Sequence, residues 1–393
     1  MIDRYRILIV HPTVVSTGGP DQCLYGLVRY LANVTSQIYL VVPENTGVVA
    51  KYTRFIHEPW IDPNAGYYHN FRYVRSNTKL LFRNLAAYPS IRKSLTESKI
   101  DLVHTNVETA WIYGLAARSL GIPSIIHLHG LTTIGTKIGA RLMPGILRRC
   151  ADHLIAVSKP AADAFIQVGI PGGMISVVEN GVDIGRFQPD VSEKRDGDPA
   201  GRFFIGAVGA ADPRKGWHNL VNACAILKQK YPNLRCRFVG DLKAGQVKYQ
   251  GRGTYHDALL RLVTEHGLQD MVEFTGVIEE MPGVYAGLDL LVQPSEIEAG
   301  PRAPIEAMAC GIPVVATRVG GNSDYVQNGV SGVLCSPDDT QALAKAIDCL
   351  LSDRELRRRM GIEGRRIALE RFSLEAHAQK VQAIYYQLLH SSN

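Results

Sequence analysis

The chain has 393 residues, and its 43 lysines and arginines against 37 aspartates and glutamates give a net charge of +6. The stretch 64–100 carries seven basic residues and one acidic residue, so this stretch alone accounts for the excess. A nucleic-acid binder spreads its positive charge more widely, so we exclude that class of protein. An apolar share of 46% and a charged share of 20% are typical of a folded globular chain, and the length predicts two or three domains.

The seven cysteines are scattered along the chain without a Cys-x-x-Cys pair, which predicts reduced thiols and not a disulfide framework or a zinc site. No apolar run approaches the roughly 20 residues that span a bilayer. The run Ile7–Val10 is too short for a signal peptide. We therefore expect a cytoplasmic protein.

Short apolar runs alternate with helical patterns from the start of the chain to its end, which predicts parallel sheets with crossover helices. The first series of predicted strands is Arg6–Val10, Ile38–Val42, Asp101–His104, Ser124–Leu128, His153–Val157 and Ile175–Val178. The second series is Phe203–Val208, Arg235–Val239, Val272–Phe274, Leu288–Val292, Pro313–Ala316 and Gly332–Cys335. The polar, Gly- and Pro-rich segment 188–201 between the two series is a linker by composition. The fold class is therefore α/β, with two doubly wound domains.

Three helices follow from apolar periodicity, over about 217–227, 374–389 and 71–86. In the last of these, Arg72, Arg75, Lys79 and Arg83 fall within an arc of about 80° beside an apolar face. We call these four residues the basic stripe. The stripe is either a solvated helix face or a contact surface for an acceptor or an anionic membrane.

The segment Pro294–Ala316 holds the strongest chemical pattern in the chain. It starts at the carboxyl end of a predicted strand, turns through a loop and opens a helix near Ala303, and ligands collect at such strand ends in open α/β sheets. Glu298 in the loop and Glu306 in the first helical turn could accept hydrogen bonds from hydroxyls while the helix amides hold phosphates. The simpler interpretation is that Glu306 complements the helix dipole and that Glu298 is a surface charge.

This segment resembles the signature of the retaining glycosyltransferases of family 4, in which two glutamates eight residues apart precede Ala-Met-Ala-x-Gly-x-Pro-Val-Val-Ala. The resemblance spans almost the whole chain. Its further motifs are Gly18-Gly19, His129 after an apolar strand, Ile155–Ser158, Asn180–Asp183, Lys215-Gly216, Gly320-Gly321 and Gly329–Leu334.

The resemblance implies a role for each matching residue. Glu306 would accept hydrogen bonds from the ribose hydroxyls of a nucleotide, and Glu298 would face the donor sugar. Lys215 would neutralise the diphosphate as the glycosidic bond breaks. His129 would contact the donor sugar or the reacting centre, whereas we expect His127 to be structural and to point to the other face of its strand. The donor cradle would be completed by Gly18, Gly19, Gly300 and Ala303, and the base would lie near Val277.

Two departures from the family pattern affect the diphosphate site. Ala210-Ala211 stands where the family usually has an Arg-Leu pair, so one cation is missing, and Arg214 or Arg302 is the expected substitute. Ala299-Gly300-Pro301-Arg302 stands where Gly-Phe-Gly-Leu is common, and Pro301 offers no amide hydrogen.

A metal is not required by this chemistry. The one Asp-x-Asp sequence, Asp196-Gly197-Asp198, lies in the predicted linker and is typical of a solvated turn. No Gly-x-Gly-x-x-Gly follows the first strand, which weakens a nicotinamide-dependent alternative. We therefore expect no cofactor, only a nucleotide-sugar substrate.

The resemblance implies the GT-B architecture, in which two Rossmann-like domains face each other across a cleft. We expect an acceptor-binding domain over 1–187, the linker over 188–201 and a nucleotide-sugar-binding domain over 202–372. A C-terminal helix over 373–393 would cross back to the first domain.

The implied activity is the retaining transfer of a hexose-type sugar from a UDP- or GDP-sugar to a hydroxyl of a glycan, lipid-linked or small-molecule acceptor, as in polysaccharide biosynthesis. A nucleotide-sugar epimerase on the same fold and a non-catalytic nucleotide-sugar-binding protein stay open as alternatives. The expected location is the cytoplasm, with peripheral attachment to the inner face of the membrane if the basic stripe binds lipid.

Overall fold

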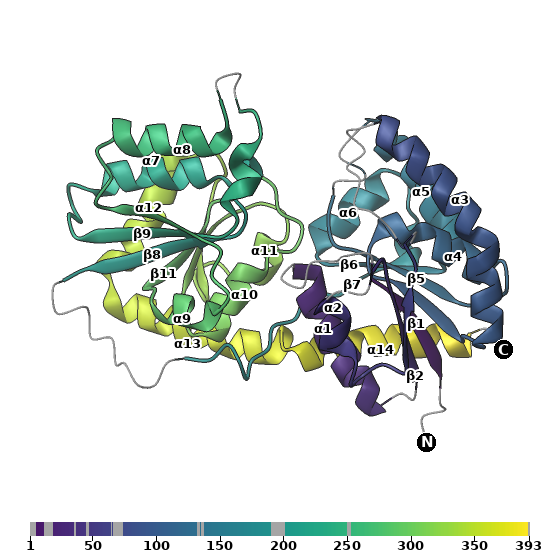
Figure 1. The fold of residues 1–393 in the computed structure, drawn as a ribbon. Coiled ribbons are helices and arrows are strands. Elements are labelled where there is room, and N and C mark those ends of the chain that lie inside the picture. The colour runs from purple at the N-terminus through teal and green to yellow at the C-terminus, as the bar shows by residue number, and fades with distance from the viewer. Residues whose placement is uncertain are drawn as a thin grey trace. The chain divides into compact units, whose positions relative to one another are not determined.

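A computed structural model describes residues 5–11, 19–34, 37–44, 47–63, 65, 74–131, 134, 137–189, 201–249 and 253–391. The chain divides into two compact units (Figure 1). Unit 1 comprises residues 1–181 and 374–393, and unit 2 comprises residues 182–373.

Unit 1 contains a parallel seven-stranded sheet with the order β3-β2-β1-β4-β5-β6-β7. Its central strands are buried on both faces, as expected for a parallel sheet covered by helices. The strands are β1 (Arg6–Val10), β2 (Gln37–Val42), β3 (Glu58–Ile61), β4 (Leu102–Thr105), β5 (Ser124–Leu128), β6 (His153–Ala156) and β7 (Ile175–Val177).

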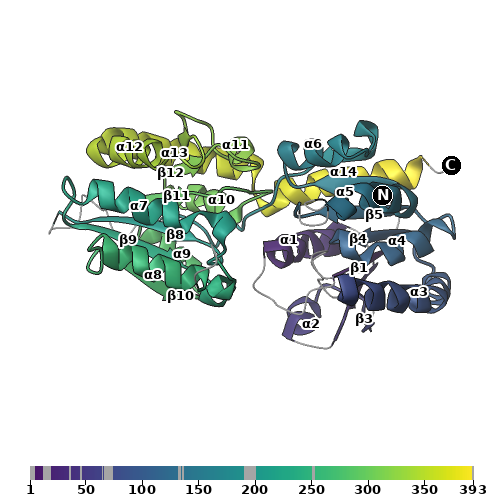
Figure 2. The ribbon, with the colours of Figure 1, turned by 90° about the horizontal axis from the view of Figure 1, so that it is seen from above.

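Helices cover both faces of this sheet. The first and the last helix of the unit, α1 and α14, pack against each other over one core cluster, whereas α3, α4 and α5 form a second layer (Figures 1 and 2). The helices are α1 (Gly19–Val34), α2 (Gly47–Tyr52), α3 (Val74–Glu97), α4 (Trp111–Arg118), α5 (Lys137–Cys150), α6 (Lys159–Gln167) and α14 (Leu374–His390).

Unit 2 repeats the architecture with a parallel six-stranded sheet in the order β10-β9-β8-β11-β12-β13. In both units the strand order reverses next to the first strand, which is the switch point where doubly wound sheets bind ligands. The strands are β8 (Phe203–Val208), β9 (Leu234–Val239), β10 (Val272–Gly276), β11 (Leu290–Gln293), β12 (Val314–Thr317) and β13 (Gly332–Cys335).

The helices of unit 2 also form two layers. Helices α7, α8 and α12 cover one face of the sheet, and α9, α10 and α13 cover the other (Figure 1). The helices are α7 (Trp217–Leu227), α8 (Tyr255–Glu265), α9 (Met281–Ala286), α10 (Arg302–Ala309), α11 (Asn322–Tyr325), α12 (Thr340–Ser352) and α13 (Arg354–Arg371).

The predicted fold class, two doubly wound parallel α/β domains, is confirmed. Each predicted strand overlaps an observed one, with ends that agree within two residues. The helix predicted to end near 86 continues to Glu97, because buried Ala87, Ile91 and Leu95 extend its apolar face while Pro89 stays exposed.

The boundary between the units lies between Gly181 and Val182, upstream of the segment 188–201. Val182 belongs with unit 2 because its N–H donates to the carbonyl of Phe372. The Arg365 guanidinium likewise donates to the carbonyl of Phe187 at 2.7 Å. Residues 190–200 of the predicted linker lie outside the described residues.

The seven cysteines all have free thiols, and Cys349 is exposed whereas the other six are buried. Within the described residues, no helix combines the length and the apolar character that crossing a bilayer requires.

Candidate active site

The carboxyl ends of β8 and β11, neighbours at the switch point of unit 2, bring the predicted donor residues together. Lys215 ends a short 3-10 turn, Pro213–Lys215, that follows β8. Glu298 lies in the loop that follows β11. Lys215 Nζ lies 2.5 Å from Glu298 Oε2, and the two side chains are 28% and 10% exposed. The structure thus brings Lys215 and Glu298, two of the predicted donor residues, into direct contact.

Close backbone contacts fix the two loops. Gly216 has a positive φ of 63°, and a Cβ there would lie 2.0 Å from the carbonyl oxygen of Pro294. The N–H of Glu296 donates to the carbonyl of Arg214 at 2.8 Å. A Cβ on Gly320 would lie 1.6 Å from the carbonyl oxygen of Glu298. The Gly216 and Gly320 motifs therefore act here by allowing neighbouring backbones to approach.

Glu306 lies in the second turn of α10, not in the first as predicted, because the helix begins at Arg302. Its carboxylate is held on both oxygens: Arg302 contacts Oε1 at 2.8 Å, and the Tyr285 hydroxyl donates to Oε2 at 2.7 Å. Burial and the nearby Glu306 raise the pKa of Tyr285 well above its usual value. Gly300 and Ala303 flank Pro301, the residue that precedes the helix.

The two arginines expected to replace the missing cation are both engaged with carboxylates. Arg302 pairs with Glu306, and Arg214 pairs with Asp212 through Nε at 2.9 Å and Nη2 at 2.8 Å. Burial raises the pKa of Asp212, but the hydrogen bonds from Arg214 outweigh it, so the pKa lies below its usual value. Val277, expected near the base, follows β10 and is 63% exposed.

In unit 1, His129 follows β5 and is half-buried. Its Nε2 contacts Asn106 Oδ1 at 3.1 Å, and Asn106 Nδ2 lies 3.4 Å from His11 Nδ1. These three residues follow β5, β4 and β1, so they meet at the carboxyl edge of the sheet. With Nε2 donating to Asn106, the acceptor nitrogen of His129 is Nδ1.

The sequence analysis expected His127 to point to the other face of its strand from His129. The structure shows that it does not. The two rings are stacked, with centroids 4.1 Å apart and an interplanar angle of 20°. The prediction was wrong because residues two apart on a strand share a face. Burial lowers the pKa of His129 to about 3, and the neighbouring histidines add to the effect.

An acidic residue supports the same edge of unit 1 from helix α1. Asp21 Oδ1 lies 3.2 Å from His11 Nε2 and accepts a hydrogen bond from the Tyr52 hydroxyl at 2.8 Å. Lys51 Nζ lies 2.5 Å from Asp21 Oδ2. Burial raises the pKa of Asp21, yet these three contacts hold it below its usual value. Gly19 begins α1, and Gly18 lies outside the described residues.

Sequence reasoning missed four residues that contact predicted site residues: Gln293, Ser295, Tyr285 and Asn106. It also missed His11, which lies against Asn106, and Asp21, which lies against His11. A usable signal existed for two of them. His11 and Gln293 directly follow predicted strands, and polar side chains at such ends are candidates for ligand contact.

The basic stripe is not tested by the described side chains. Arg72 lies outside the described residues, and Arg75, Lys79 and Arg83 lie in α3 but their side chains are not described.

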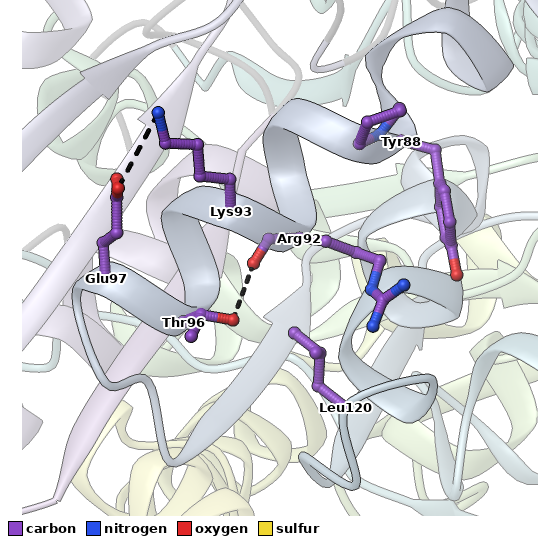
Figure 3. Close-up of a pocket in the computed structure, with 7 residues that line it drawn as sticks. Tyr88, Arg92, Lys93, Thr96, Glu97 and Leu120 are labelled. Carbon is purple, nitrogen blue, oxygen red and sulfur yellow. Dashed lines mark hydrogen bonds and ion pairs between the residues drawn. The ribbon is translucent and has the colours of Figure 1, made fainter.

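The described end of α3 borders a surface pocket of about 490 Å³, lined by Tyr88, Pro89, Arg92, Lys93, Thr96, Glu97 and Leu120 (Figure 3). This pocket is formed by the end of α3 and the turn after α4, which lead into the amino ends of β4 and β5 and not to the carboxyl ends where the site residues lie, so we assign it no part in the site. Within the described part of the chain, no group of three His, Cys, Asp or Glu side chains is arranged to hold a metal ion.

Comparison with known families matches both units. The model of "Glycosyltransferase Family 4" matches residues 17–186, and the model of "Glycosyl transferases group 1" matches residues 190–367. A D-inositol 3-phosphate glycosyltransferase of Thermobifida fusca is 31% identical over 311 residues, which cover 74% of this chain and 70% of the relative.

Two further relatives have comparable sequence identity to this chain. The corresponding protein of Salinispora arenicola is 30% identical over 68% of this chain, and the chain covers 64% of that relative. A GDP-mannose-dependent phosphatidylinositol monomannoside mannosyltransferase of Mycolicibacterium smegmatis is 28% identical over 76% of this chain and 80% of its own length.

The fold matches solved structures over almost its full length. Anabaena HepE, solved with UDP and glucose, has a TM-score of 0.79 at 24% identity and covers 98% of this chain and 100% of its own. The sequence signature, the two parallel sheets and these matches agree, and the chain belongs to family 4 of the glycosyltransferases, the glycosyl transferases group 1, with the GT-B fold.

Proposed function

We propose that this protein is a retaining, metal-independent glycosyltransferase that moves a hexose-type sugar from a UDP- or GDP-sugar to a hydroxyl of a glycan, lipid-linked or small-molecule acceptor. The contact of Lys215 with Glu298 at the switch point of unit 2 carries the proposal. It joins a cation suited to a diphosphate with a carboxylate suited to sugar hydroxyls, at the sheet edge where ligands bind.

In this proposal Lys215 stabilises the negative charge that grows on the leaving diphosphate, and so takes the part that a metal ion plays elsewhere. Amides near Gly300 and Ala303 at the start of α10 add donors for the phosphates. Glu306, held by Arg302 and Tyr285, accepts from the ribose hydroxyls, and the base lies against the backbone near Val277.

Unit 1 supplies the acceptor side, and Gly18 and Gly19 complete the donor cradle. His129 contacts the donor sugar or the reacting centre, with Nδ1 as its acceptor atom and Asn106 holding Nε2. Retention is proposed with attack from the face that the diphosphate leaves, because no residue of the proposed site is a clear nucleophile for a double displacement.

The donor is proposed as a UDP- or GDP-sugar because both nucleotides occur among similar proteins. The Mycolicibacterium relative is named for GDP-mannose, and the HepE structure was solved with UDP and glucose. The acceptors named for the inositol relatives are small or lipid-linked molecules, which fits the proposed acceptor class.

A thermal-shift screen against UDP-, GDP- and dTDP-sugars tests the donor. A ligand at a hundred times its Kd adds about 2.7 kcal/mol to the free energy of unfolding, so a true donor stands out clearly. Failure of all three to stabilise the protein would contradict the proposal. A donor that stabilises without any transfer would favour the non-catalytic alternative, and conversion of the donor without an acceptor would favour an epimerase.

Kinetics of transfer then test the roles of single residues. Lys215→Ala should lower kcat/KM about 10²- to 10³-fold, the usual loss when a group that stabilises transition-state charge is removed. Glu306→Ala should lower kcat/KM as well. Near-normal values for both variants would overturn these assignments.

We further propose peripheral contact with the inner face of an anionic membrane. The basic stripe is one contact surface, and the described helix α5 offers a second. It carries Lys137, Arg141, Arg148 and Arg149 and no acidic residue, while Ile138 and Leu142 on one face are 58% and 52% exposed. Exposed apolar side chains beside basic ones are typical of helices that lie on membrane surfaces.

A further inference from the structure

One oxygen of the Glu298 carboxylate receives every hydrogen bond that the described residues make to this side chain. Lys215 Nζ lies 2.5 Å from Oε2, and Gln293 Nε2 and Ser295 Oγ each donate to Oε2 at 3.3 Å. Within the described part of the chain, Oε1 receives none. The carboxylate is therefore oriented, with Oε2 held by the protein and Oε1 left to a ligand.

Two of the three donors belong to a buried, fixed network. Gln293 and Ser295 are 3% and 0% exposed, and Gln293 Nε2 also donates to Ser295 Oγ at 2.8 Å. The Ser295 carbonyl accepts from Thr317 Oγ1 at 2.5 Å. Asn322 Nδ2 in turn donates to the carbonyl of Thr317 at 3.0 Å. Neighbouring strands β11 and β12 thus lock these two donors in place.

The third donor is of a different kind. Lys215 comes from the separate loop after β8, its side chain is 28% exposed, and an ammonium on a four-carbon stem can move to another anion. The diphosphate of a nucleotide sugar is such an anion. If Lys215 moves to it, Glu298 loses its nearest partner while its side chain stays only 10% exposed. A carboxylate at such a depth is costly without other hydrogen bonds.

We propose that Gln293 and Ser295 are positioning residues that keep Oε2 of Glu298 paired when Lys215 turns to the diphosphate, and so hold Oε1 toward the donor sugar. The inference rests on the proposed function, because it requires a nucleotide-sugar donor. It assigns Glu298 and its two positioning residues to recognition of the donor sugar and not of the nucleotide.

Because Glu298 serves the donor sugar and Lys215 the diphosphate, variants of the two positioning residues should differ in how strongly they bind a nucleotide sugar and a bare nucleotide. A nucleoside diphosphate contacts Lys215 and Glu306 but has no donor sugar for Glu298. The nucleotide sugar needs Glu298 in addition. Both ligands draw Lys215 to the diphosphate, but only the nucleotide sugar also needs Oε1 of Glu298 held toward it. Loss of the positioning hydrogen bonds should therefore weaken binding of the nucleotide sugar more than binding of the bare nucleotide.

Isothermal titration of the full chain with UDP, UDP-glucose, GDP and GDP-mannose tests the inference on Ser295→Ala and Gln293→Met. We expect each variant to bind the sugar conjugate of the preferred nucleotide about tenfold more weakly than the wild type does, the factor for one hydrogen bond, and to lose less affinity for the bare nucleotide. Exposed Ser323 provides the matched control, and Ser323→Ala should leave both affinities unchanged.

Circular dichroism and the melting temperature establish that each variant is folded. If either Ser295→Ala or Gln293→Met does not fold, the other variant carries the test. Equal weakening of nucleotide and nucleotide sugar would overturn the inference, because it would show a merely structural role. Unchanged affinity for both ligands in both variants would overturn it as well. A wild-type chain that binds no nucleotide would overturn the proposed function together with this inference, so the two failures are distinguishable.

Discussion

Arg302 and Glu306, four residues apart in helix α10, form an ion pair of 2.8 Å in which the side chains are only 16% and 9% exposed. Tyr285 donates to the other carboxylate oxygen from helix α9. Each carboxylate oxygen accepts more than one hydrogen bond, so ribose hydroxyls can still bind a carboxylate held in this way. The sequence departs from the family's glycine-rich turn by an arginine at position 302. This arginine fixes the orientation of Glu306.

Removal of either member of this pair should destabilise the protein strongly. Arg302→Met leaves a buried carboxylate and Glu306→Gln leaves a buried guanidinium, and each should lower the free energy of unfolding by about 3 kcal/mol. The double variant leaves no unpaired charge, so its loss should be smaller than the sum of the two single losses by 1 kcal/mol or more, on the order of couplings between contacting residues. Urea denaturation of the four proteins measures this coupling, and additive losses would contradict it.

The close approach of Gly216 to the carbonyl of Pro294 leads to a second prediction. Gly216→Ala should lower the free energy of unfolding by about 2 kcal/mol or more, because an alanine is strained at a φ of 63° and its Cβ would meet the Pro294 carbonyl. It should also weaken nucleotide-sugar binding, since the loop carrying Lys215 must shift. Gly283→Ala in α9 is the matched control, with open space around its Cβ, and should be neutral or slightly stabilising. Wild-type donor affinity in Gly216→Ala would show that the close approach is not needed.

The sequence predicts the buried strands well because their signal is local. Ile7–Val10 and Leu290–Val292 are continuous apolar runs, and such runs are typical of strands covered on both faces. The same local signal is weak in the edge strand Glu58–Ile61, and the sequence analysis missed this strand. It pairs on one side only, three of its four residues are exposed, and Pro59 argues against a strand.

The candidate site was predicted only in part because its partners are distant in sequence. The pairing of Lys215 with Glu298 rests on family resemblance, since 83 residues separate them. Gln293 and Ser295 lie just beyond a predicted strand, where polar side chains are candidates for ligand contact. The sequence does not distinguish a residue that binds a ligand there from one that orients another side chain. Arg302 was expected on a diphosphate, and its contact with Glu306 emerges only from the helical spacing of four residues.

The proposed membrane contact predicts sedimentation with vesicles that contain phosphatidylglycerol and not with neutral phosphatidylcholine vesicles. Four basic residues near an anionic surface supply up to about 4 kcal/mol, so reversing the charges of Arg72, Arg75, Lys79 and Arg83 should abolish most binding. Ile138→Ser combined with Leu142→Ser tests the surface of α5.

Leu260→Ser, on unit 2, is the control for the loss of an exposed apolar side chain, since Leu260 is 44% exposed. It should leave sedimentation unchanged. Binding that ignores the anionic lipid content, or that survives the charge reversal, would refute the contribution of the basic stripe.

The stacked histidines of unit 1 predict a loss of stability in acid. Burial lowers the pKa of His127 well below 6.5, and neither of its ring nitrogens has a hydrogen-bond partner among the described residues. Since the unfolded chain binds a proton near pH 6.5 and the folded chain does not, the stabilisation is complete above that pH and is lost as the pH falls below it. His127→Phe keeps an aromatic ring in the stack and removes this proton site, so the decrease in the free energy of unfolding between pH 7.5 and pH 5 should be about 2 kcal/mol smaller than in the wild type. Urea denaturation at the two pH values measures the difference, with exposed His57→Phe as the control. An unchanged pH dependence in His127→Phe would show that the buried ring is protonated in the folded protein or does not contribute.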